Sequence, residues 1–117
     1  MKLSKVQELM KADLLTGDEL VDKEIVAGGA ADLMRDILAK SAKDSLLITG
    51  VVREEVLETA ISAQVGAILF VRGKKMTGDL LQRARDARMP VLRTQYSMFA
   101  ASGILYINGL KGLDGTW

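Results

Sequence analysis

The 117-residue sequence predicts a single α/β domain of three layers, in which a mostly parallel central sheet has helices on both faces. Chain length is the first reason, because a chain of this size normally forms one domain with a substantial core. From residue 45 onward, short apolar runs alternate with segments of helical spacing. The short runs are continuously apolar, which is typical of parallel strands that helices cover on both sides. We therefore expect right-handed crossovers between successive strands.

The N-terminal part of the chain has weaker patterns. Ser4 and Gln7 have the spacing of a capping box, which predicts that a first helix begins there. Asp32 is a suitable N-cap for a helix whose apolar face includes residues 33, 34, 37 and 38. The first helix is expected over residues 4–12. It is followed by a short strand or turn over 13–17, a surface connection over 18–23, and a strand over 24–27 that ends at a glycine pair.

The C-terminal part has the stronger alternation. Strands are expected over 46–48, 67–71 and 90–92, and helices with apolar stripes over 56–63, 80–87 and 98–104. Thr77 and Ser97 are placed to cap the last two helices, and Pro90 opens a strand, where a missing N–H does least harm. We expect the domain to cover residues 1–108. Residues 109–117 form a glycine-rich tail that either frays or docks Trp117 on a partner chain.

Two residue types are missing from the composition. The chain contains no cysteine, which excludes disulfides, thiol nucleophiles and cysteine-based metal sites. It contains no histidine, which removes the commonest general base, the usual triads and most transition-metal sites. We expect no catalytic residue, no metal and no cofactor. No stretch approaches the roughly 20 apolar residues of a membrane span, and the N-terminus does not resemble a signal peptide, so we expect a cytoplasmic protein with no membrane contact.

Charge is unevenly distributed along the chain. The segment from Arg72 to Arg93 contains seven Lys or Arg and two Asp, which gives it a charge of +5, although the net charge of the whole chain is only +1. Arg83, Arg85 and Arg88 are candidates for contact with nucleic acid. Five aromatic residues and a net charge near zero support neither a stacking platform nor a strong phosphate footprint, so we expect no nucleic-acid partner. A solvated helix face explains the same cations.

Three loops follow the expected parallel strands and meet at one edge of the sheet. Each loop leads into a helix N-terminus, where free N–H groups and the helix dipole favour an anion. Glycines at 50 and 73 allow close approach to the backbone, and Arg72 and Lys74 can add charge-assisted hydrogen bonds. The alternative is that the glycines are turn residues and the cations are solvated. The candidate ligand-binding residues are Thr49, Gly50, Arg53, Arg72, Gly73, Lys74 and Thr94.

Other candidate motifs are weaker. Neither a P-loop nor a Gly-x-Gly-x-x-Gly fingerprint occurs. Paired carboxylates for acid/base catalysis could be drawn from Glu54, Glu55 and Glu58. These residues fall on the polar side of an amphipathic helix, however, which favours a solvent-exposed helix face. Met98 and Phe99 favour core or interface positions.

Several short stretches together carry a resemblance to a known family. They are Leu14–Gly17, Gly28-Gly29 with Asp32-Leu33, Leu47–Gly50, Gly66–Leu69, Arg72-Gly73, and Pro90–Thr94 leading to Phe99. In order and spacing they resemble the DRTGG domain family between Val6 and about Tyr106. The contiguous string Asp-Arg-Thr-Gly-Gly is absent, and Arg72-Gly73 stands where the family usually has two glycines.

The resemblance implies a regulatory, non-catalytic α/β module, similar to the N-terminal domain of HPr kinase/phosphorylase and to domains between CBS domains in some pyrophosphatases. It also implies self-association. We therefore expect a module that senses a small anionic or nucleotide-like ligand, or docks a partner protein, as a homodimer. The alternatives are a purely structural or protein-interaction subunit without a ligand, and a phosphotransferase that uses Lys74 or Lys75.

Overall fold

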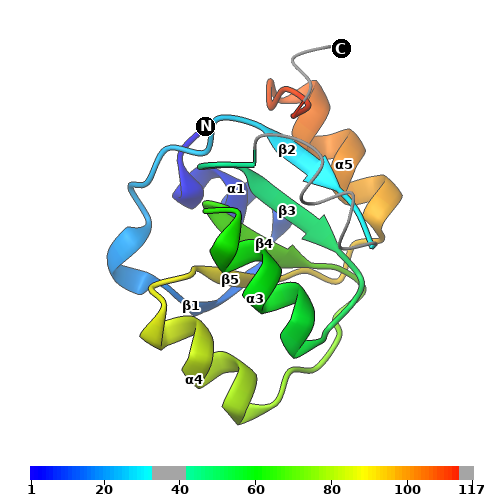
Figure 1. The fold of residues 1–117 in the computed structure, drawn as a ribbon. Coiled ribbons are helices and arrows are strands. Elements are labelled where there is room, and N and C mark those ends of the chain that lie inside the picture. Colours follow the sequence, from blue (N-terminus) through cyan, green and yellow to red (C-terminus); the bar gives the residue numbers. More distant parts are fainter. Residues whose placement is uncertain (33–41, 114–117) are drawn as a thin grey trace.

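A five-stranded sheet forms the centre of the computed structural model, which describes residues 1–32 and 42–113 (Figure 1). The strand order across the sheet is β1-β5-β4-β3-β2. The strands are β1 (Asp13–Thr16), β2 (Gly28–Ala30), β3 (Leu46–Thr49), β4 (Ala67–Phe70) and β5 (Val91–Arg93). The helices are α1 (Leu3–Met10), α3 (Glu54–Ser62), α4 (Gly78–Asp86) and α5 (Met98–Ile107), with a short 3₁₀ helix, η1 (Asp18–Leu20).

Four neighbouring strands, β2 to β5, run parallel, and only the edge strand β1 is antiparallel to its neighbour β5. Ile48 of β3 pairs with Leu69 of β4, which pairs in turn with Leu92 of β5. All residues of β3 and β4 are buried. The structure thus confirms the predicted mostly parallel sheet. Its central strands are buried on both faces and apolar except for Thr49, as expected for parallel strands covered by helices.

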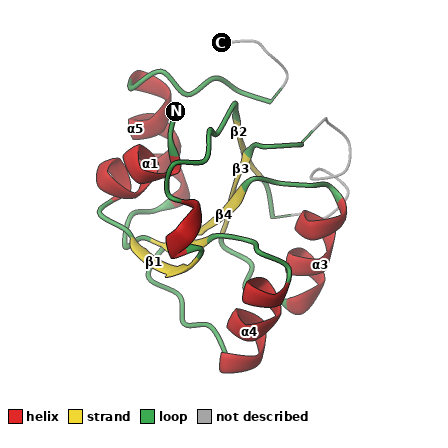
Figure 2. Ribbon diagram, turned by 90° about the vertical axis from the view of Figure 1, so that its left-hand side faces the viewer, coloured by secondary structure: helices red, strands yellow, loops and turns green. Residues whose placement is uncertain are grey.

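Among the described residues, α1 and α5 cover one face of the sheet and α3 and α4 cover the other, so the domain has three layers (Figure 2). Alternate residues of each strand point to opposite faces. Ile48 and Leu69 therefore join the core cluster that includes side chains of α1 and α5, whereas Leu47 and Ile68 join the cluster of α3 and α4. None of the described helices has the length and apolar character needed to cross a membrane.

The predicted N-caps of the last two helices are confirmed. Thr77 Oγ1 accepts a hydrogen bond from Leu80 N at 3.2 Å, and Ser97 Oγ accepts one from Ala100 N at 3.1 Å. The predicted capping box at Ser4 is wrong, because α1 begins at Leu3 after Lys2, and no side chain caps it. The helix predicted from the capping of Asp32 falls in 33–41, outside the described residues.

The strand predicted over residues 24–27 is also wrong, because the strand that pairs with β3 is Gly28–Ala30. Glycine normally weakens a strand, but here a side chain at either glycine would collide with the C-terminal segment. A Cβ on Gly28 would lie 2.9 Å from Leu110 Cδ2, and one on Gly29 would lie 2.5 Å from Leu113 Cδ1. Leucines distant in sequence thus take the place of the missing side chains, which no local pattern reveals.

The first part of the C-terminal tail lies along β2. Leu110 is only 5% exposed and belongs to the core. Gly28 N donates to Lys111 O at 2.8 Å, and Leu113 N donates to Gly28 O at 3.1 Å, so this segment extends the sheet by a bridge at Gly112. Trp117 lies outside the described residues.

Candidate functional site

The carboxyl ends of β3, β4 and β5 lie side by side at one edge of the sheet. Thr49 pairs with Phe70, and Phe70 pairs with Arg93, so the three strands end at the same level. The predicted ligand loops leave the sheet directly after these residues and lead to α3, α4 and α5. Topology therefore brings the predicted loops together, and we call this side of the molecule the carboxyl edge.

The second and third loops are bonded to each other through their backbones. Arg72 N donates to Tyr96 O at 2.8 Å, and Gly73 N donates to Thr94 O at 2.7 Å. Both Arg72 and Gly73 have left-handed backbone conformations, with φ of 60° and 62°. A Cβ on Gly73 would lie 2.6 Å from Gln95 Nε2. The positive φ therefore favours glycine at position 73, and the N–H group of Gly73 is already used within the chain.

The first loop is closed by an aspartate that we expected only as a helix cap. Asp32 Oδ1 accepts hydrogen bonds from Thr49 Oγ1 at 3.1 Å and from Gly50 N at 3.0 Å. Thr49 Oγ1 also accepts a bond from Val51 N at 3.2 Å. The carboxylate of Asp32 thus already accepts the hydrogen bonds that Thr49 and Gly50 could offer to an anion. A carboxylate two residues after the end of β2 is the sequence signal for this role.

Thr94 has a similar internal role and is 1% exposed. Its hydroxyl donates to Met10 O at 2.7 Å and accepts from Tyr96 N at 3.2 Å. The first bond satisfies a carbonyl at the C-terminal end of α1, a group that a helix cannot satisfy by itself. Thr94 therefore joins α1 to the carboxyl edge.

The predicted cations remain at the surface. The guanidinium of Arg72 lies over Gly50, since a Cβ on Gly50 would be 3.1 Å from Arg72 Nη2. Arg72 and Arg53 are exposed, and Lys74 is partly buried. Within residues 1–32 and 42–113, none of the three forms a salt bridge. The cations of this edge are therefore available to an anion.

A pocket of about 430 Å³ lies beside these loops, between the first turns of α3 and α4. Its lining residues are Val52, Arg53, Glu54, Lys75, Thr77, Asp79, Leu80 and Arg83. Arg53 is the one predicted site residue that lines it, and Lys75 does so in place of Lys74. Three cations and two carboxylates line it. The N-termini of both helices lie nearby, and because helix N-termini favour negative charge, the pocket favours an anion.

Arg83 is the one cation of this pocket that is held by a carboxylate in the described parts of the chain. Its Nε and Nη2 donate to the two oxygens of Glu58 at 2.8 and 2.9 Å, which joins α4 to α3. The hydrogen bonds from Arg83 lower the pKa of Glu58, and the same contact raises the pKa of Arg83. Glu58 is therefore a charged partner of Arg83 and is not suited to act as a general acid.

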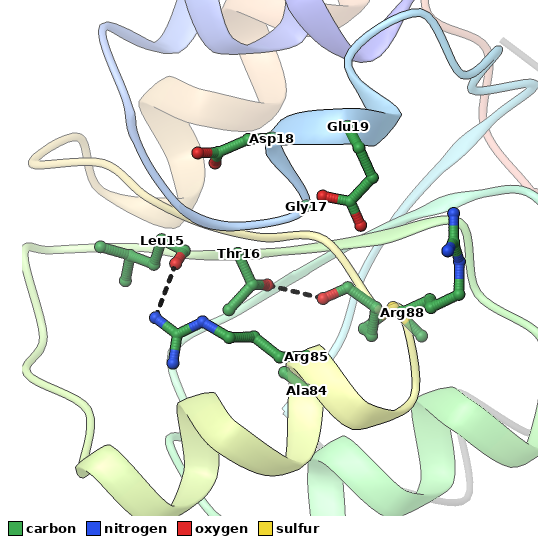
Figure 3. Close-up of a pocket in the computed structure, with 9 residues that line it drawn as sticks. Leu15, Thr16, Gly17, Asp18, Glu19, Ala84, Arg85 and Arg88 are labelled. Carbon is green, nitrogen blue, oxygen red and sulfur yellow. Dashed lines mark hydrogen bonds between the residues drawn. The ribbon is translucent and has the colours of Figure 1, made fainter.

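A second pocket, of about 330 Å³, lies at the opposite edge of the sheet, between the turn after β1 and the end of α4 (Figure 3). Asp18 and Glu19 lie on η1, and the side chains of Arg85, at the end of α4, and Arg88, just after it, extend in opposite directions. Two cations and two carboxylates balance in charge here. Because Glu58 neutralises Arg83, the remaining charges of the pocket at the carboxyl edge balance as well. That pocket is the better candidate for an anion because two helix N-termini border it, whereas the pocket of Figure 3 lies at the C-terminal end of α4.

No cluster of three or more potential metal ligands occurs in the part of the chain that the structure describes.

Comparisons with known proteins add a family and a structural neighbour. The family model described as the DRTGG domain matches residues 5–106. No curated protein matches the chain. Among solved structures, the chain is similar to the CBS and DRTGG domains of the regulatory region of Clostridium perfringens pyrophosphatase complexed with the activator diadenosine tetraphosphate, with a TM-score of 0.76 and 15% identity. The match covers 99% of this chain and 50% of that chain, so this protein spans half of its neighbour's length.

Proposed function

The chain belongs to the DRTGG domain family, and we propose that it is a non-catalytic, cytoplasmic regulatory module that senses a small anionic or nucleotide-like ligand as a homodimer. The observation that carries the ligand proposal is the pocket between the first turns of α3 and α4. Arg53 and Lys75 line it and form no ion pair with any described residue. A phosphate group in this pocket would complement both cations and both helix N-termini.

The candidate residues divide into two roles in this proposal. Arg53 and Lys75 supply charge to the ligand inside the pocket, and Arg72 and Lys74 add positive charge to the same edge of the sheet. The remaining candidates shape the loops, because their polar groups already form hydrogen bonds within the chain; they are Thr49, Gly50, Gly73 and Thr94. The neighbouring pyrophosphatase region, which was solved with a nucleotide activator, supports nucleotides as the first ligands to test.

Isothermal titration calorimetry with diadenosine tetraphosphate, ATP and inorganic phosphate tests the proposal. We expect at least one of these anions to bind, and the double variant Arg53→Gln/Lys75→Gln to raise its Kd by at least tenfold. The matched control is Arg85→Gln/Arg88→Gln, which removes two cations from the pocket of Figure 3 and leaves the Kd unchanged. Affinity should also fall as the salt concentration rises, because exposed charges are screened.

Two results would contradict this proposal. If none of the anions binds to the folded protein at millimolar concentration, the sensing role fails. If the Arg85/Arg88 control loses binding and the Arg53/Lys75 variant does not, the ligand site lies at the opposite edge of the sheet.

A second candidate function is a protein-interaction subunit with no small-molecule ligand. It is favoured by the outer face of α5, where Phe99 is 90% and Ile107 80% exposed. Exposed apolar residues that cluster in this way are typical of an interaction surface. Sedimentation analysis that finds a dimer, together with calorimetry that finds no bound anion, would favour this function over the first.

A further inference from the structure

Helix α5 is apolar on the side that faces away from its own domain. Its inner face packs in the core through Ala101, at 0% exposure, and Leu105, at 1%. Its outer face has Phe99 and Ile107 almost fully exposed, and Tyr106 is 45% exposed. The helix contains no charged residue between positions 98 and 107. A helix that is apolar all round is normally buried, so the domain by itself leaves one face of α5 uncovered.

Gly103 lies in the middle of this uncovered face. A Cβ at this position would meet no atom within 4 Å, so no described neighbour requires a glycine there. Glycine within a helix is destabilising relative to alanine, because it loses more backbone entropy on folding. The distance between two packed helices depends on the size of the side chains at their contact. A glycine at position 103 would therefore let the backbone of a second helix approach α5 closely, which explains why a small residue stands there.

The arrangement of this face is symmetrical about Gly103. Phe99 lies four residues before it and Ile107 four residues after it, so all three share one side of the helix. When a second α5 crosses antiparallel at Gly103, Phe99 of each copy faces Ile107 of the other. A large–small–large stripe that complements itself in this way is compatible with a two-fold interface, in which both copies use the same patch. An unrelated partner would not need this symmetry.

The exposed area is also of the right order. One buried aromatic residue contributes roughly 150–250 Å². Phe99, Tyr106 and Ile107, each scaled by its exposed fraction, together offer on the order of 400 Å². A standard interface buries about 800 Å² on each partner. These three side chains would thus supply the apolar half of such an interface, and the flanking residues its rim.

We propose that the outer face of α5 is the contact through which two copies of this chain associate, antiparallel and crossing at Gly103. This inference rests on the homodimer of the proposed function and names its surface. It is independent of the ligand pocket, whose residues belong to α3, α4 and the loops before them.

The absence of cysteine from the sequence allows a direct test by single-cysteine cross-linking. Under a mild oxidant, we expect Gly103→Cys to form more disulfide-linked dimer than Val26→Cys, because the crossing brings the two 103 positions together, although the added side chain itself weakens the non-covalent dimer. Phe99→Cys alone should not cross-link, since its two copies are offset by about 12 Å along the helices, farther than a disulfide reaches. A mixture of Phe99→Cys and Ile107→Cys chains should cross-link. Val26→Cys, at 59% exposure in the wild type, is the control for random collision.

Sedimentation velocity provides the second measurement. We expect Phe99→Asp to raise the dimer dissociation constant at least 100-fold, and Val26→Asp to leave it unchanged. Both positions are exposed, so the variants should keep the wild-type circular dichroism spectrum.

Other outcomes would contradict the α5 interface, its antiparallel crossing or the homodimer itself. If the wild type is a dimer but Phe99→Asp does not weaken it and Gly103→Cys cross-links no more than Val26→Cys, the α5 interface is wrong and the homodimer stands. If Phe99→Cys alone cross-links as well as Gly103→Cys, the antiparallel crossing is wrong. If the wild type is a monomer at 100 µM, both the homodimer and this interface are wrong, and the ligand pocket is unaffected.

Discussion

Thr94→Val separates a structural role from a ligand-binding role at the carboxyl edge. The Thr94 hydroxyl makes two hydrogen bonds, one to Met10 O at 2.7 Å and one from Tyr96 N at 3.2 Å. Valine has nearly the same shape and keeps the packing, but it leaves both backbone groups without this partner. Met10 is fully buried, so water cannot easily replace the lost bond at its carbonyl.

The expected cost follows from these two groups. A buried donor or acceptor left without a partner costs about 1–3 kcal/mol, and Tyr96 is only partly buried, so we expect a total loss of about 2–3 kcal/mol. For a domain of this size, that loss lowers the Tm by roughly 6–12 °C. Urea unfolding followed by circular dichroism measures the free energy of unfolding. Thr94→Ser, which keeps the hydroxyl, is the matched control and should lose only about 1 kcal/mol.

The anion affinity of Thr94→Val can refute the structural role of the Thr94 hydroxyl. If Thr94 only holds the loops in place, folded Thr94→Val should bind the identified anion within about twofold of the wild type at low temperature. An unfolding free energy within about 0.5 kcal/mol of the wild type, together with a tenfold loss of affinity, would show that the hydroxyl contacts the ligand directly.

Three further predictions concern other elements. Gly73→Ala should destabilise the domain by about 1 kcal/mol in urea, because alanine is strained at a positive φ, whereas the exposed Gln95 side chain can move away from the added Cβ; unchanged stability would contradict this geometry. The pKa of Glu58 is lowered in the folded state by Arg83, so their contact stabilises the fold above about pH 4.3 and is lost as the pH falls below it. Glu58→Gln should therefore flatten the acid limb of the pH–stability curve, and an identical curve would remove the basis for this pair. Gly103→Ala should stabilise the dilute monomer by about 0.5–1 kcal/mol and weaken the dimer in sedimentation, and a gain in both would contradict close helix contact.

The sequence predicted the central strands and the last two helix starts because these depend on local chemistry. β4 is continuously apolar, and Thr77 and Ser97 cap their helices with their own hydroxyls. The three predicted ligand loops share one edge because parallel strands always bring their carboxyl ends together. Local patterns failed at β2, where Gly28 and Gly29 form a strand whose face is filled by leucines more than 80 residues further along the chain.

The sequence by itself thus determined the fold class, the family resemblance and the edge at which cations gather. Only the tertiary structure decided which of these groups are free. Thr49 and Thr94 resemble ligand contacts in the sequence, but partners distant along the chain, Asp32 and Met10, use their hydroxyls. Arg53 and Lys75 line a pocket because α3 and α4 begin side by side. The physical reason is that residue type and spacing report propensity, charge and periodicity, whereas the hydrogen-bond partner of a buried group depends on which distant segment packs against it.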